Sequence, residues 1–148
     1  MKKKIYFLII IFILAFSGCT NNNDDITIDD IIYLEEDSSF SFKTYGDTIF
    51  FAVEVWLKNN TNSKINFSFK IIFDDPILSR ELGKEVFLGE EINFTPLVFT
   101  IEPGKKSLYG GSYKIDKSHL SGDEINSLTN NVKIMLIDDN GYERIIKK

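Results

Sequence analysis

Two neighbouring stretches in which apolar and polar residues alternate restrict the fold of this 148-residue chain more than any other feature. They run from Thr48 to Lys58 and from Lys64 to Phe73. The apolar positions are Ile49, Phe51, Val53, Val55 and Leu57 in the first, and Ile65, Phe67, Phe69, Ile71 and Phe73 in the second. Successive side chains of a β-strand point to opposite faces, so a period of two predicts two strands that each bury one face. Residues 59–63 supply the turn between them.

The opposite faces of these two strands differ in character. The second strand carries Lys64, Asn66, Ser68 and Lys70 there. Such polar residues are expected where one side of an antiparallel sheet meets water. The first strand carries Phe50, Ala52 and Trp56 instead. We therefore expect a neighbouring element to cover that face, and the alternative is that it offers a surface to a partner.

The rest of the chain also reads as short strands separated by turns. Further strands are predicted at Val86–Phe94, Leu97–Glu102, Ser107–Ile115, Val132–Asp138 and Tyr142–Ile146. Pro103-Gly104 and Asp139-Asn140-Gly141 have the composition of tight turns. Acidic residues interrupt the earlier candidates Ile26–Leu34 and Phe40–Tyr45. Whether residues 26–45 form one strand or two stays open at this point.

Two short helical turns are predicted from residues that complete helix ends. Asp75 can cap a turn that has Pro76 in its first position and Gly83 after its end. Ser121 and Glu124 have the spacing of a capping box, which predicts a helical turn over 122–128. Leu120 and Ile125 flank this second cap as a hydrophobic staple.

Many short strands with frequent turns and no alternation of strands and helices predict an all-β antiparallel sandwich, with a barrel as the alternative. The stretches VEVWLKNNTNSKINFSF and FTIEPGKKS resemble bacterial immunoglobulin-like domains, over about Thr48–Lys148. The resemblance implies an immunoglobulin-like β-sandwich with one or two short helical turns. It carries no catalytic residues with it, because the shared features report strand and turn geometry.

The N-terminal residues have the layout of a secretion signal. Three lysines, Lys2 to Lys4, precede twelve uncharged residues, a run too short to span a bilayer. Ser17 and Gly18 then precede Cys19, the only cysteine, and this arrangement resembles the lipobox of bacterial lipoproteins. The resemblance implies cleavage after Gly18 and a lipid anchor on Cys19. The alternative is an ordinary secretory signal that leaves Cys19 as a free thiol.

These features divide the chain into a signal peptide at 1–18, a lipidated cysteine with a polar tether at 19–25, and a sandwich domain at 26–148. The seven tether residues reach on the order of 24 Å when fully extended. Residues 1–18 hold three of the 17 basic residues and none of the 22 acidic ones. The remainder therefore has 14 basic and 22 acidic residues, a net charge of −8, which argues against nucleic acid as a partner.

No catalytic or cofactor-binding motif stands out in the sequence. His119 is the only histidine, and we interpret it as a loop residue rather than a catalytic base. There is no nucleophile elbow, zinc-binding spacing or phosphate-binding loop. The acidic pairs at 24–25, 29–30, 74–75 and 138–139 leave calcium as an alternative. We therefore predict no enzyme activity, no cofactor and no metal.

The leading functional hypothesis is an extracytoplasmic lipoprotein anchored to the plasma or outer membrane, according to the host envelope, that binds or positions an unidentified protein or surface ligand. The alternatives are a proteinase inhibitor that presents the loop 74–84, and a small hydrolase. The residues expected to face a partner are Ile77, Leu78, Arg80, Glu81, His119 and Leu120. They fall at the end opposite the tether if residues 26–45 supply one strand, and at the tether end if they supply two.

Overall fold

The computed structural model describes residues 26–89 and 96–147. The elements in chain order are η1 (Ile28–Asp30), β1 (Ile31–Tyr33), η2 (Glu35–Asp37), β2 (Ser39–Tyr45), β3 (Thr48–Asn59), β4 (Ile65–Phe73), α2 (Pro76–Leu82), β5 (Glu85–Phe87), β6 (Val98–Ile101), β7 (Lys106–Asp116), η3 (Lys117–His119), α3 (Gly122–Ser127), β8 (Val132–Ile137) and β9 (Glu143–Lys147). The strands form two antiparallel sheets, which confirms the all-β prediction. Among the described helices, none has the length and apolar character needed to cross a bilayer.

The first sheet, sheet A, is built around the long strand β3. Leu57 of β3 pairs with Tyr33 of β1 on one side and with Ser107 of β7 on the other. Farther along β3, Ile49 pairs with Thr44 of β2 on one side and again with β7 on the other. Because a strand residue has one neighbour on each side, β1 and β2 must lie on the same edge of β3. Residues 31–45 therefore run along that edge as one strand, which η2 interrupts.

The second sheet, sheet B, repeats this arrangement around β4. Ser68 pairs with Val98 of β6 on one side and with Ile137 of β8 on the other. Ile71 pairs with Val86 of β5 and with β8. Strands β5 and β6 therefore share one edge of β4, and β9 follows β8 on the opposite side. The predicted strand at 86–94 is shorter in its described part, and residues 90–94 lie outside the described residues.

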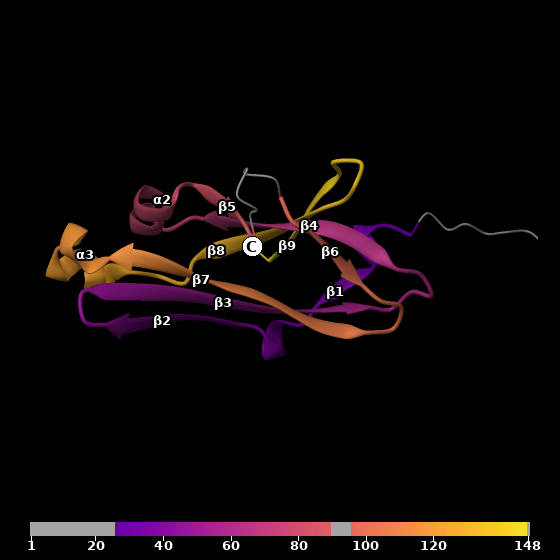
Figure 1. Ribbon diagram of the computed structural model, residues 1–148, viewed down its shortest axis with the longest axis horizontal. Helices are drawn as coiled ribbons and strands as arrows, with labels where there is room; N and C mark the ends of the chain where they lie inside the picture. Colours follow the sequence, from indigo (N-terminus) through magenta and orange to yellow (C-terminus); the bar gives the residue numbers. More distant parts are fainter. Residues whose placement is uncertain (1–25, 90–95, 148) are drawn as a thin grey trace, which may run out of the picture.

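The two sheets pack face to face through one hydrophobic core (Figure 1). All ten apolar residues predicted to line the inner faces of β3 and β4 are buried, and none is more than 4% exposed. Aromatic rings join the layers: the centroids of Phe51 and Phe73 are 5.9 Å apart, and those of Phe67 and Tyr109 are 5.3 Å apart. Alternation along the two central strands thus identified both inner faces correctly.

Both predicted helical turns are present. Asp75 caps α2, Pro76 is its first residue, and Gly83 follows its end with a positive φ of 92°. The predicted capping box opens α3, which ends at Ser127, one residue earlier than predicted. These helices and η3 lie together at one end of the sandwich, which we call the helix end (Figure 1).

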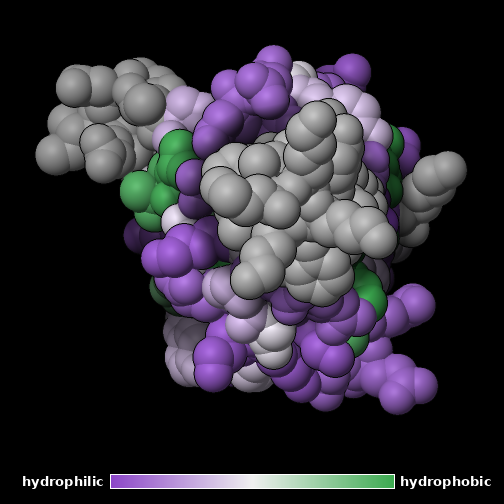
Figure 2. All heavy atoms as spheres, turned by 90° about the vertical axis from the view of Figure 1, so that its right-hand side faces the viewer, coloured by the Kyte–Doolittle hydropathy of each residue, from purple (hydrophilic) through white to green (hydrophobic). Residues whose placement is uncertain are grey.

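The opposite end, which we call the Ile26 end, contains the beginning of the described chain. Ile26 lines a shallow depression there together with Lys64 and Asn140, which belong to the β3–β4 and β8–β9 turns. Arg144 fixes the following residues, because its guanidinium donates to the carbonyl oxygens of Ile28 and Ile31 at 2.6 and 2.9 Å. In the view onto this end, hydrophilic residues predominate outside the grey atoms, and hydrophobic residues form separate patches (Figure 2).

The expected cover over the outer face of β3 is not found. Apart from η2 beside Trp56, no helix or strand of the described residues is layered on this face (Figure 1). Side chains from the same sheet lie beside its aromatic residues instead. The Tyr45 ring lies 5.9 Å from that of Phe50, and the Lys106 ammonium lies 4.5 Å from the Trp56 ring. The outer face of sheet A is therefore open to solvent between these side chains.

Candidate functional site

The buried carboxylate of Asp75 joins two segments of the helix end by hydrogen bonds. One of its oxygens accepts hydrogen bonds from the backbone amides of Ile77 and Leu78, at 2.8 and 3.0 Å. The other accepts from the amide and hydroxyl of Thr129, at 2.9 and 2.8 Å. Burial by itself would raise the pKa of Asp75, but these hydrogen bonds together hold the pKa below its usual range. Asp75 thus joins the start of α2 to the segment that leads into β8.

A second contact joins the two helices at their exposed surface. Arg80 in α2 donates from Nη1 to Glu124 Oε1 in α3 at 2.7 Å, and from Nε to Glu81 at 2.8 Å. Glu124 also accepts from the amide of Ser121 at 2.8 Å, which closes the capping box. The hydrogen bond from the Ser121 amide, followed by those from Arg80 and the Ser121 hydroxyl, lowers the pKa of Glu124 to about 2. This carboxylate is therefore ionised over nearly the whole pH range.

His119 lies beside the same helix surface. Its Nδ1 is 3.6 Å from an oxygen of Glu81, and its Nε2 is 4.0 Å from an oxygen of Asp116. Hydrogen bonds from Ser118 lower the pKa of Asp116. Within the described residues, no hydroxyl or thiol is hydrogen-bonded to this imidazole. The geometry places His119 beside the surface network of Arg80, Glu81 and Glu124.

The six residues predicted to face a partner therefore separate into two groups. Arg80, Glu81 and His119 meet in one network at the helix end. Leu78 and Leu120 instead belong to the hydrophobic core, with 0% and 9% of their surface exposed, so the prediction that they face a partner is wrong. Ile77 is half-buried and packs against the core. Burial of these apolar residues is what holds the helices on the ends of the sheets.

Sequence reasoning did not identify the two side chains that join distant segments at the helix end. Glu124 was predicted only as a capping residue and Asp75 only as a cap, whereas each also bonds a segment 44 or 54 residues away in the chain. Their capping role has a local signature in the sequence. The long-range partners, Arg80 and Thr129, have none.

The acidic pairs considered for calcium are dispersed. Within the part of the chain that the structure describes, they lie in η1, before α2 and in the β8–β9 turn, and residues 24–25 are outside it. No group of three or more His, Cys, Asp or Glu residues in that part is placed to hold a metal ion. Gly18 and Cys19 also lie outside the described residues, so the predicted cleavage and lipid attachment remain predictions.

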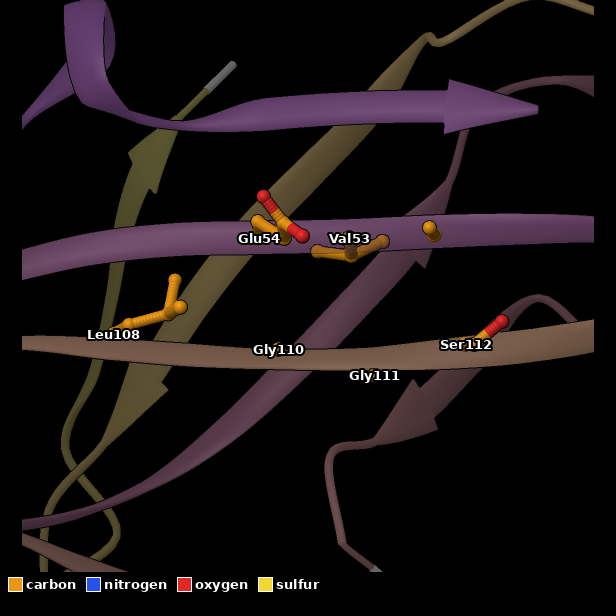
Figure 3. A pocket seen from close by; sticks show the side chains of 7 residues that line it. Val53, Glu54, Leu108, Gly110, Gly111 and Ser112 are labelled. Carbon is orange, nitrogen blue, oxygen red and sulfur yellow. The ribbon is translucent and has the colours of Figure 1, made fainter. Parts of the chain in front are cut away.

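A shallow hollow interrupts the outer face of sheet A. Figure 3 shows Leu108 and Ser112 on β7 at its two ends, with Gly110 and Gly111 between them and Glu54 on β3. The hollow exists because this part of the sheet has small side chains. At Gly110 a Cβ atom would collide with the carbonyl oxygen of Val53, so glycine is required there by the close approach of the two strands.

Comparisons with known proteins give little further guidance. No protein-family model and no curated protein matches this chain. Among solved structures, it is similar to a conserved hypothetical protein from Bacillus anthracis, with 16% sequence identity, a TM-score of 0.31 and 80% of each chain covered.

Proposed function

We propose that this protein is a lipid-anchored extracytoplasmic lipoprotein whose immunoglobulin-like domain acts as a binding or structural module without enzymatic activity. The anchor rests on the stretch Ser17-Gly18-Cys19, and the orientation of the domain rests on the single interrupted strand at 31–45. It takes the chain from the Ile26 end to the helix end before β3 begins. An anchor at Cys19 with a reach of roughly 24 Å would hold the Ile26 end near a bilayer. The helix end would then face away from the membrane.

The strand order supports the immunoglobulin-like assignment. If each split edge is counted as one strand, sheet A has three strands and sheet B has four. The connections β3–β4, β6–β7 and β7–β8 pass between the sheets, and β8–β9 is a hairpin within sheet B. Seven strands joined by such crossings between two packed sheets are the general pattern of immunoglobulin-like sandwiches.

The surface network at the helix end supports a role in recognition. Its members are fixed on short helices at the end of a rigid sandwich, a position from which loops commonly carry binding residues. The Arg80 side chain is 50% exposed and the His119 side chain 64% exposed. These two side chains offer an ion-paired guanidinium and an imidazole to an approaching protein.

The alternative of a proteinase inhibitor receives no support from the loop that would carry it. An inhibitory loop is extended, whereas residues 76–82 form α2 and are held by the buried Asp75 cap. The helix would have to unfold before a protease could bind this segment in an extended form.

The anchor is tested by mass spectrometry of the N-terminal peptide and by membrane fractionation of cells producing the full-length chain. We expect the wild-type chain to begin at Cys19 with attached acyl groups, and Cys19→Ser to remain uncleaved or to leave the membrane fraction. Ser17→Ala is the matched control and should behave like wild type. A mature wild-type chain with an unmodified Cys19, or a Cys19→Ser variant that is processed and fractionates normally, would contradict the lipoprotein assignment.

A further inference from the structure

The lysines of the two outer sheet faces are paired very differently. On sheet B, Lys64 lies 2.9 Å from Glu102, Lys70 lies 3.5 Å from Glu85, and Lys133 lies 3.1 Å from Asp74. Sheet A carries four lysines on its outer face, namely Lys43, Lys58, Lys106 and Lys114. Of these, within the described residues, only Lys106 forms an ion pair, with Asp37. In the described structure, the outer face of sheet A thus keeps three lysines outside ion pairs, beside two carboxylates, those of Glu54 and Asp116.

Two of these lysines flank an aromatic ring. Phe50 on β3 pairs with Lys43 on β2 and with Lys114 on β7, so the three residues form one row across the sheet. Residues directly opposite one another in a sheet project to the same face. Two strand spacings separate the lysine backbones by about 10 Å. Both lysines are exposed, and Phe50 is half-buried between them.

The next row supplies hydroxyl groups. Ala52 pairs with Ser41 on β2 and with Ser112 on β7. Ala52 and Ser112 also line the hollow shown in Figure 3, which continues from this row toward Leu108. The two rows therefore place two ammonium groups, an aromatic ring and two hydroxyls side by side on the sheet, and Ala52 and Ser112 connect them to the shallow hollow.

The nearest carboxylates are engaged by other groups. Asp116 accepts hydrogen bonds from the amide and hydroxyl of Ser118, at 2.9 and 2.7 Å, and lies near His119. These hydrogen bonds, with a smaller contribution from the charge of Lys114, lower the pKa of Asp116. Glu54, two rows from Phe50, accepts from the Ser39 hydroxyl at 3.1 Å. Neither forms an ion pair with Lys43 or Lys114 in the described part of the chain. These two lysines thus remain available to an external anion.

We propose that the cluster formed by Ser41, Lys43, Phe50, Ala52, Ser112 and Lys114 binds an acidic polysaccharide. The negative face of the Phe50 ring suits the weakly positive C–H groups of a sugar ring. Anionic groups on the chain pair with Lys43 and Lys114, and sugar hydroxyls exchange hydrogen bonds with Ser41 and Ser112. A nucleic acid carries charge more densely than two lysines can neutralise, so the sparser charge of an acidic polysaccharide suits this face better.

The test uses the full-length chain in a nonionic detergent and three polymers. Polygalacturonate supplies carboxylates on sugars, dextran supplies uncharged sugars, and polyglutamate supplies carboxylates without sugars. We expect calorimetry at low and at physiological salt to show binding of polygalacturonate that weakens as salt rises. Dextran and polyglutamate should each bind at least about tenfold more weakly, since each offers only part of the recognised chemistry.

Variants assign the binding to this face. Lys43→Gln with Lys114→Gln should raise the Kd for polygalacturonate by at least about tenfold, through the loss of two charge-assisted contacts. Phe50→Thr keeps a strand-forming residue and should also weaken polygalacturonate binding, with little effect on its salt dependence. The matched control is the double variant Lys64→Gln with Lys133→Gln, which removes the same amount of charge from sheet B. It should change the Kd by less than about twofold, because isolated exposed charges contribute little.

Three results would overturn the proposal. The first is the absence of polygalacturonate binding by a chain whose thermal unfolding is cooperative. The second is an affinity for polyglutamate equal to that for polygalacturonate, which would show that the outer face of sheet A binds polyanions in general. The third is an equal loss of affinity in the sheet B control. Circular dichroism of every variant separates loss of binding from loss of fold.

Discussion

Arg80 and Glu124 lie 44 residues apart in sequence and form a 2.7 Å contact between the ends of α2 and α3. The same carboxylate completes the capping box of α3 through the Ser121 amide. One ionised side chain therefore stabilises the start of one helix and attaches it to the other. The contact is exposed, so its importance is in positioning the helix end more than in overall stability.

The state of Glu124 predicts a specific pH dependence. The pKa of this group is about 2 in the folded chain and ordinarily about 4.5, so the unfolded chain binds its proton first as pH falls. The stability that Glu124 contributes is complete above its unfolded value and is lost as pH falls toward 2. Thermal unfolding of Glu124→Gln should accordingly differ from wild type at pH 7 and converge with it at low pH. Glu36→Gln, which changes an exposed carboxylate in η2, should show no such convergence, and an identical pH profile for both variants would contradict the assignment.

Asp75 should make a much larger contribution because it is buried and fully hydrogen-bonded. Asp75→Ala removes a helix cap and leaves the Thr129 donors without their acceptor, so we expect a loss of about 2 to 4 kcal/mol in the free energy of unfolding. Asp74→Asn is the matched control. It breaks only an exposed pair with Lys133 and should cost less than about 1 kcal/mol. Urea unfolding followed by Trp56 fluorescence would compare the two, and equal losses would mean that Asp75 does not organise the helix end.

Phe69 tests the core. Its side chain is 0% exposed between the sheets, and Phe69→Ala should cost about 3 to 5 kcal/mol through lost burial and a cavity. That loss is comparable to the whole stability of many domains, about 5 to 15 kcal/mol. Ser68→Ala, on the opposite face of the same strand, should change stability by less than about 0.5 kcal/mol. Similar melting temperatures for both variants would contradict the assigned inner face.

The helix end is tested as a recognition surface by replacing Arg80, Glu81 and His119 together with alanine. The sheets and their core do not depend on these side chains, so we expect the variant to fold. We expect crosslinking on the native cell surface to recover partners with the wild-type chain that the triple variant loses. A variant with Glu35, Glu36 and Asp37 replaced by alanine changes η2 instead and should retain them. Recovery of the same partners by the helix-end variant would exclude this surface.

The lysine cluster and the helix end make separate predictions. Loss of polysaccharide binding in the Lys43 and Lys114 variant should leave partner recovery at the helix end unchanged, because neither lysine forms a hydrogen bond or ion pair with Arg80, Glu81 or His119 in the described structure. Loss of both in either variant would indicate one continuous binding surface across the edge of sheet A.

Local features of the sequence were sufficient for most strands, for the helical turns at α2 and α3, and for the two inner faces. They did not predict the three short helical turns η1, η2 and η3. Alternation from Ile49 to Leu57 and from Ile65 to Phe73 specifies which side chains are buried, because a strand reverses its side chains at every residue. The caps at Asp75 and Ser121 were equally readable, since a capping side chain bonds to amides two or three residues away.

The tertiary structure alone decided how distant segments meet. Strands β1 and β2 share one edge of β3 because η2 interrupts the strand without reversing it, and no local pattern distinguishes that course from two separate strands. The Arg80–Glu124 contact and the row of Lys43, Phe50 and Lys114 likewise depend on which strands become neighbours. Pairing partners are chosen by the packing of the whole core, whereas alternation and capping act over a few residues. The sequence by itself therefore determined the faces of the strands, and only the fold brought these charges and rings together.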